Sequence, residues 1–230
     1  MKALSALVHV FTALGAVCAL LATQAVFTHD PAMLFVWLYV ALIIDAVDGT
    51  LARAVDVHGN LPRFSGERLD LVIDYLTYVF VPVLALIEWR FLEGWIGSLL
   101  AAGILLSSLF HFSDMKSKSQ DNCFIGFPAI WNIFAFYAFA LAAPAWVVEA
   151  SAAIAILATF LPMHWVHPLR VVQLRPLTLL ATGLAAIAGV VTLMEGPPAP
   201  PWVQALLIAV AMYYVALALY FWHQAAAGSH

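Results

Sequence analysis

The sequence has very little charge for its length. Of its 230 residues only 10% are Asp, Glu, Lys or Arg, whereas 65% are hydrophobic, and the mean hydropathy is +0.98. Soluble globular domains carry about 25% charged residues. This deficit excludes an ordinary soluble domain and predicts an integral membrane protein.

A basic surplus and a cysteine framework are also missing. The formal net charge is −4, so no excess of cations is present to attract nucleic acid. The two cysteines, Cys18 and Cys123, are too far apart in sequence to suggest a disulfide framework or a zinc site. Function therefore has to be sought in the few charges that the chain does carry.

Long apolar runs, separated by polar or proline-rich stretches, supply most of the sequence. A membrane-spanning helix needs about 20 apolar residues. On that measure eight spans are expected, at residues 7–27, 33–54, 69–87, 95–112, 127–142, 146–163, 177–194 and 202–222. The sequence thus predicts an all-α, polytopic membrane protein with about eight transmembrane helices.

One domain, residues 1–224, accounts for all eight expected spans, and residues 225–230, AAAGSH, read as a cloning remnant. The N-terminal run could also be a cleaved signal peptide, but it is long enough to span and is interpreted as the first helix. Because the number of spans is even, both termini are expected on one side of the membrane.

The distribution of cations predicts which side that is. Eight of the nine Lys and Arg residues fall at the N-terminus or in the even-numbered loops: Lys2, Arg53, Arg63, Arg68, Lys116, Lys118, Arg170 and Arg175. Only Arg90 falls on the other side. Cytoplasmic loops are enriched in Lys and Arg, so both termini are predicted to be cytoplasmic.

Four aspartates interrupt the apolar runs around the second loop. Asp45 and Asp48 lie in the second expected helix, and Asp70 and Asp74 lie in the third. An Asp at the centre of a membrane helix costs roughly 2.5–3.5 kcal/mol, so four of them require compensation. Spacings of three and four residues put each pair on one helix face, and antiparallel pairing is expected to bring all four together. Oxygen ligands alone favour Mg²⁺ or Mn²⁺, as two ions in one cluster.

These residues form a pattern, D-x2-D-G-x2-A-R followed by G-x3-D-x3-D, that resembles the signature of the CDP-alcohol phosphotransferases. The matching positions are Asp45, Asp48, Gly49, Ala52, Arg53, Gly66, Asp70 and Asp74. The twelve residues between Arg53 and Gly66 make a longer gap than is usual in that family. HVFTALGA near the N-terminus, LPRFSGERLDLVIDYLTYVFVP and DNCFIGFPAIWN further resemble a bacterial branch of the family that uses choline, so the likeness spans most of the chain.

The resemblance implies an enzyme of the bacterial inner membrane that transfers a phosphatidyl group from CDP-diacylglycerol to choline and releases CMP. It also implies a homodimer with its active site facing the cytoplasm. Asp45, Asp48 and Asp70 would hold metal together with Asp74, which would also be the general base. The implied nucleotide-binding residues are Asp48, Gly49, Ala52, Arg53, Gly66 and Asp70. Apart from the resemblance, Gly49, Ala52 and Gly66 lack bulk and would let a ligand approach, and Arg53 could offset phosphate charge.

A quaternary ammonium cannot donate a hydrogen bond, so proteins usually bind it with aromatic faces. Tyr78 lies four residues after Asp74 on the same helical stripe, and Trp131 follows the GFPAIWN turn. These two, with the amide of Asn132, are the expected choline-binding residues. Each aromatic ring could instead face lipid or serve core packing, alternatives that the sequence leaves open.

Two other functions remain open at this point. The acceptor could be serine, inositol phosphate or glycerol phosphate, but a phosphorylated acceptor would need clustered arginines, and the sequence offers few near the third to fifth spans. A cation-coupled transporter would also gather acids in the membrane, although it would release no CMP.

Overall fold

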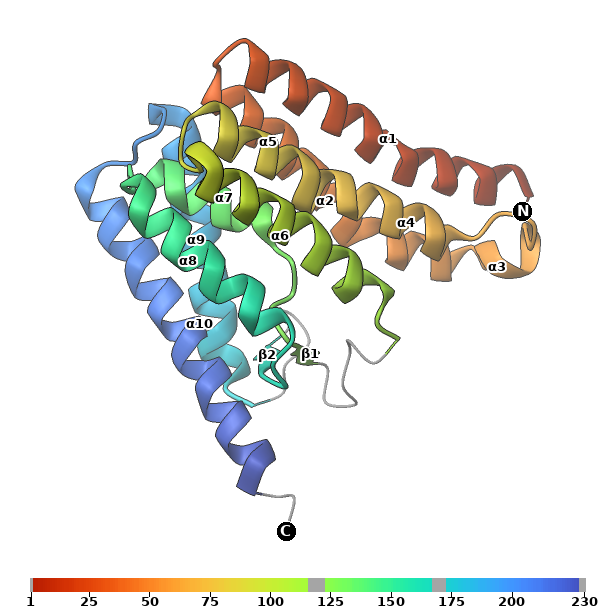
Figure 1. Ribbon diagram of the computed structural model, residues 1–230. Helices are drawn as coiled ribbons and strands as arrows, with labels where there is room; N and C mark the ends of the chain where they lie inside the picture. The colour runs from red at the N-terminus through yellow and green to blue at the C-terminus, as the bar shows by residue number, and fades with distance from the viewer. Residues whose placement is uncertain (1, 116–122, 167–172, 228–230) are drawn as a thin grey trace.

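The computed structural model describes residues 2–115, 123–166 and 173–227 (Figure 1). Lys116, Lys118 and Arg170, which contributed to the predicted orientation, lie outside these ranges. The elements in chain order are α1 (Lys2–Phe27), α2 (Pro31–Ala54), α3 (Val57–Asn60), α4 (Gly66–Asp74), the π-helix η1 (Tyr75–Phe80), α5 (Val81–Glu88), α6 (Gly94–Ser113), β1 (Cys123–Ile125), α7 (Trp131–Ala140), α8 (Ala145–Thr159), β2 (His164–Val166), α9 (Arg175–Glu195) and α10 (Pro201–Ala227).

Six helical segments of the described chain are long and apolar enough to cross a membrane. They are α1, α2, the continuous segment Gly66–Glu88 that contains α4, η1 and α5, then α6, α9 and α10. The two remaining predicted spans correspond to the shorter apolar helices α7, with 10 residues, and α8, with 15. The prediction of a polytopic helical membrane protein is therefore confirmed.

The fifth and sixth predicted spans are longer than the helices α7 and α8 that they correspond to, and a proline explains the difference in each case. A proline disfavours helical backbone at the residue before it. Pro128 lies between Gly126 and Ala129, which both have positive φ, so α7 cannot begin at Phe127 as predicted. At the other end of α8, the helix stops at Thr159, shortly before Pro162.

The two helices that carry the acidic motif have defined starts. Asp30 caps α2 by accepting a hydrogen bond from the Met33 N–H at 3.0 Å, with Pro31 at the first helical position. Ser65 caps α4 by accepting one from the Arg68 N–H at 3.3 Å. Such caps satisfy backbone donors that have no partner within the helix. They fix the register of the aspartates that follow.

Helix α1 packs along both motif helices. It contacts α2, α4 and α5, and Figure 1 shows these segments running beside one another. A Cβ atom on Gly15 would lie 2.4 Å from Cγ2 of Ile73, so the missing side chain permits the close approach of α1 to α4. A large apolar core that includes Leu34, Leu86 and Trp131 ties these helices to α6, α7 and α8.

A two-stranded antiparallel sheet joins two segments that were predicted to be loops. Cys123 pairs with Val166, and Ile125 pairs with His164. The chain then meets the C-terminal end of α8, since the Phe127 N–H donates to the Ala158 carbonyl at 3.1 Å. The described structure is therefore helical apart from this small sheet, which the sequence analysis did not anticipate.

Gly126 should tolerate no side chain. Its φ is +78°, and an added Cβ would lie 2.2 Å from the backbone oxygen of Thr159. We expect Gly126→Ala to lower the free energy of unfolding by about 1–3 kcal/mol. In detergent this would appear as a melting temperature several degrees lower. Gly183→Ala is the control, because nothing lies within 4 Å of that added Cβ. Equal melting temperatures for the two variants would contradict the described packing of this turn.

Candidate metal centre

Three of the four motif aspartates meet between α2 and α4. One carboxylate oxygen from each of Asp45, Asp70 and Asp74 lies within 4.8 Å of the others, and all three residues are partly buried. Asp45 comes from the C-terminal half of α2, and the other two lie four residues apart on α4. The predicted antiparallel pairing thus gathers carboxylates from both helices.

Three carboxylates at this separation repel one another unless a cation or protons intervene. Two unit charges 4.8 Å apart interact with about 3–4 kcal/mol at an effective dielectric constant near 20. The donor set consists only of carboxylate oxygen atoms, which suits a hard divalent cation such as Mg²⁺ or Mn²⁺. The residues present therefore fit a metal centre.

Asp48 does not join this group of three. It is buried, with 6% of its surface exposed, and its carboxylate interacts with the hydroxyl of Thr12 on α1. Three residues advance an α-helix by about 300°, so Asp48 lies about 60° around α2 from Asp45. That rotation turns it toward α1, which the sequence analysis did not place beside the motif.

The hydroxyl of Tyr78 reaches the same cluster. It donates a hydrogen bond to Oδ2 of Asp45 at 2.5 Å. Tyr78 lies in the π-helix η1, which begins directly after Asp74. From the sequence Tyr78 is predicted to contact choline, and the structure places its polar end on a carboxylate of the candidate metal centre.

The π-helix was not predicted, although Pro82 carries a signal for it. Proline has no N–H, so in a regular α-helix the carbonyl of Tyr78 would lose its partner and clash with the proline ring. Single π-helical turns occur where a helix accommodates such a disruption, and they are frequent at functional sites. Pro82 follows η1 at the start of α5.

The residues predicted to bind the nucleotide lie in the C-terminal part of α2 and the N-terminal part of α4, which are called the motif ends of these helices. Gly49 and Ala52 are partly buried, and Arg53 is exposed, with its guanidinium donating to the Thr50 hydroxyl at 3.2 Å. Gly66 opens α4 against α1, where an added Cβ would lie 3.3 Å from Cε1 of His9. Glycine at position 66 thus lets α4 begin close to His9 of α1.

Trp131 and Asn132 are both buried at the start of α7. The Trp131 indole N–H donates to the Ser108 hydroxyl at 2.9 Å, and its ring packs against Phe127 and Phe134 with centroids 5.0 and 5.1 Å away. The Asn132 side-chain oxygen accepts from the Ile133 N–H. In this structure the Trp131 ring serves interior packing, one of the alternatives that the sequence left open.

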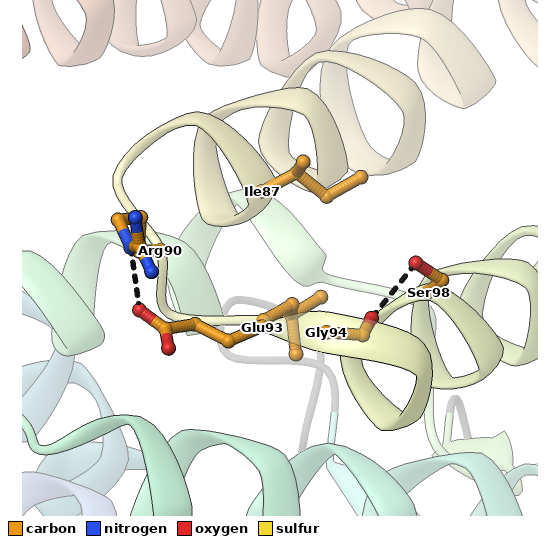
Figure 2. Close-up of a pocket in the computed structure, with 6 residues that line it drawn as sticks. Ile87, Arg90, Glu93, Gly94 and Ser98 are labelled. Carbon is orange, nitrogen blue, oxygen red and sulfur yellow. Dashed lines mark hydrogen bonds and ion pairs between the residues drawn. The ribbon is translucent and has the colours of Figure 1, made fainter.

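A surface hollow lies far from the carboxylates. It has a volume of about 420 Å³ and is lined by Arg90, Glu93 and Ser98 with their neighbours between α5 and α6 (Figure 2). Arg90 pairs with Glu93 there at 2.7 Å, and this ion pair lowers the pKa of Glu93 below its ordinary value. Ile87 lies thirteen positions after Asp74 along the helical segment, a rise of about 20 Å. The hollow therefore takes no part in the acidic cluster.

Comparisons with known proteins give the chain relatives over most of its length. It is 46% identical to a phosphatidylcholine synthase of Bradyrhizobium diazoefficiens over 93% of this chain and 80% of that protein. It is 39% identical to a phosphatidylcholine synthase of Pseudomonas aeruginosa, over 93% and 90%, and 38% identical to one of Rhizobium meliloti, over 90% and 86%. No family model matches the chain.

We expect Mn²⁺ to raise the melting temperature of the protein through the three clustered carboxylates. A ligand at 100 times its Kd stabilises a protein by about 2.7 kcal/mol. Asp70→Asn should abolish most of the Mn²⁺-dependent shift, whereas Glu67→Gln, an exposed acid on the same helix, should keep it. A full shift in Asp70→Asn would show that Mn²⁺ binds elsewhere.

Proposed function

The chain belongs to the bacterial phosphatidylcholine synthases of the CDP-alcohol phosphotransferase family, and we propose that its three clustered carboxylates are the site of phosphatidyl transfer from CDP-diacylglycerol to choline. The observation that carries this proposal is the meeting of Asp45, Asp70 and Asp74 within 4.8 Å. All three belong to the motif that the chain shares with that family.

The proposed cofactor is Mg²⁺ or Mn²⁺, as two ions per site. Asp45, Asp70 and Asp74 would hold them, and Asp48 would join by turning away from Thr12. Bound there, the cations would offset the charge of the pyrophosphate and of the departing CMP. The gathering of three carboxylates within 4.8 Å, with oxygen atoms as the donors, supports this assignment.

Asp74 is the proposed general base. It lies one helical turn beyond Asp70, deeper in the membrane when the motif end of α4 is taken as cytoplasmic. Its carboxylate would take the proton from the choline hydroxyl as that oxygen forms a bond to the β-phosphorus, the one that carries the diacylglycerol. The bond from that phosphorus to the CMP oxygen breaks, and CMP leaves.

The nucleotide would lie along the motif ends of α2 and α4. Room for its ribose is left by the small residues Gly49, Ala52 and Gly66. The exposed guanidinium of Arg53 can pair with phosphate. Asp48 and Asp70 would contact it from the carboxylate side. The hydrogen bond from Arg53 to Thr50 holds the guanidinium at this end of α2.

For choline, the proposed contacts are the ring of Tyr78 together with Trp131 and Asn132. The ring of Tyr78 lies beside the carboxylates where the hydroxyl of choline would have to be deprotonated, and an aromatic face attracts a quaternary ammonium. Trp131 and Asn132 are buried, so their contribution would require α7 to shift.

The proposed setting is the bacterial inner membrane, with residues 1–224 as one domain, the motif facing the cytoplasm and two copies forming a homodimer. The distribution of Lys and Arg supports this orientation. The cytoplasmic location also fits the reaction, since choline would enter from the aqueous side and CMP would leave to it, while the acyl chains of CDP-diacylglycerol stay in the bilayer.

The reaction can be measured directly. Purified protein in detergent with CDP-diacylglycerol, choline and Mn²⁺ should release CMP and phosphatidylcholine in equal amounts. Loss of the base in Asp74→Asn should lower kcat by roughly 10²–10⁴-fold, whereas Glu67→Gln should remain close to the unaltered protein.

Other outcomes have defined meanings. CMP release with serine, inositol phosphate or glycerol phosphate in place of choline would keep the site and overturn the acceptor. Undiminished turnover by Asp74→Asn would overturn the base. Absence of CMP with every acceptor, together with cation-dependent transport in vesicles, would establish the transporter.

The ring of Tyr78 can be tested apart from its hydroxyl. Tyr78→Leu removes the aromatic face, and Tyr78→Phe keeps it. An exposed cation–π contact contributes about 0.5–1 kcal/mol and a desolvated one about 2, so we expect the choline KM of the Leu variant to exceed that of the Phe variant by about 3–30-fold. Equal choline KM values for the two variants would remove the ring from the choline site.

A further inference from the structure

We propose that Tyr78 is a positioning residue for Asp45, whose carboxylate it orients through its hydroxyl. This inference rests on the proposed function, because it takes Asp45 as a ligand of the metal centre. The main evidence is the 2.5 Å hydrogen bond that the Tyr78 hydroxyl donates to Oδ2 of Asp45. This bond joins η1 to α2 across 33 residues of sequence.

The local chemistry makes this hydrogen bond a strong constraint. Hydrogen bonds from a hydroxyl to an ionised carboxylate are shorter and roughly twice as strong as those between neutral groups. A carboxylate has only acceptor oxygens, so the tyrosine must be the donor. The bond occupies one oxygen of Asp45 and fixes the plane of its carboxylate. In metal sites such outer partners orient the ligands and are often worth 10–100-fold in affinity.

The π-helix places Tyr78 for this task. In an α-helix a residue four positions on lies about 40° further around the axis. A π-helix has wider turns, with hydrogen bonds that span five residues instead of four, so Tyr78 stays more nearly in line with Asp74 and Asp70. From that side of the helix its hydroxyl reaches Asp45 on α2.

The same π-helix contains a matched control. Tyr75 also lies in η1 and is also partly buried, but its hydroxyl donates to the backbone carbonyl of Leu105 on α6 at 3.1 Å. Tyr75→Phe and Tyr78→Phe therefore each remove one hydroxyl and one hydrogen bond from one short helix. Only Tyr78→Phe removes a bond to a proposed metal ligand.

The experiment is a titration of each purified variant with Mn²⁺ alone. The concentration of free Mn²⁺ is measured by electron paramagnetic resonance at each step. We expect Tyr78→Phe to raise the Kd for Mn²⁺ by about 10-fold or more, and Tyr75→Phe to change it less than about 2-fold. Because Phe keeps the ring, Tyr78→Phe should leave the choline KM, measured at saturating Mn²⁺, within about 2-fold of the unaltered protein.

Asp45→Asn separates failure of this inference from failure of the proposed site. Should Asp45→Asn lose affinity for Mn²⁺ while Tyr78→Phe binds as the unaltered protein does, the positioning role is wrong and the metal site stands. Mn²⁺ binding that survives Asp45→Asn undiminished would overturn the metal site itself. A raised choline KM in Tyr78→Phe with unchanged Mn²⁺ affinity would assign the hydroxyl to the acceptor pocket instead.

A double variant tests whether Tyr78 acts through Asp45. If it does, adding Tyr78→Phe to Asp45→Asn should weaken the remaining Mn²⁺ binding by less than about 2-fold, because the bond's partner has already been changed. A further 10-fold loss in the double variant would show that Tyr78 acts on another group. The double variant is compared with Asp45→Asn alone. A general loss of stability caused by Tyr78→Phe would therefore also weaken Mn²⁺ binding in the double variant.

Discussion

Repulsion among Asp45, Asp70 and Asp74 is the constraint on which the rest of the structure depends. Carboxylates within 4.8 Å of one another in an apolar bundle would separate if their helices were free to do so. The surrounding packing prevents that separation. Helix α1 lies against both motif helices, with Gly15 in close contact with Ile73, and the core around Leu34 and Leu86 holds the remainder of the bundle to them.

Much of this arrangement could be predicted from the sequence, because hydropathy and segment length are strong signals in a membrane protein. The eight predicted spans correspond to eight helical segments, and the spacing of Asp70 and Asp74 correctly placed both on one helix face. The lengths of two short helices were overestimated because apolar residues continue past the prolines that limit them, Pro128 before α7 and Pro162 after α8. The strands β1 and β2 have three residues each, too few for a recognisable alternation.

The details of the site depended on contacts that sequence spacing does not encode. Asp48 was expected to lie with the other acids, yet its position around α2 turns it toward Thr12. The local sequence does not indicate that α1 packs at that point. The π-helix was missed since proline within an apolar run is tolerated in membrane helices. That irregular turn carries Tyr78, whose hydroxyl donates to Asp45.

The central claim is that a divalent cation binds between α2 and α4. Anomalous X-ray scattering at the manganese edge, from crystals grown with Mn²⁺, tests it most directly because it locates the ion without reference to activity. We expect an anomalous peak in contact with the carboxylate oxygens of Asp45, Asp70 and Asp74. A peak only at other residues, or none beside these carboxylates at saturating Mn²⁺, would contradict it.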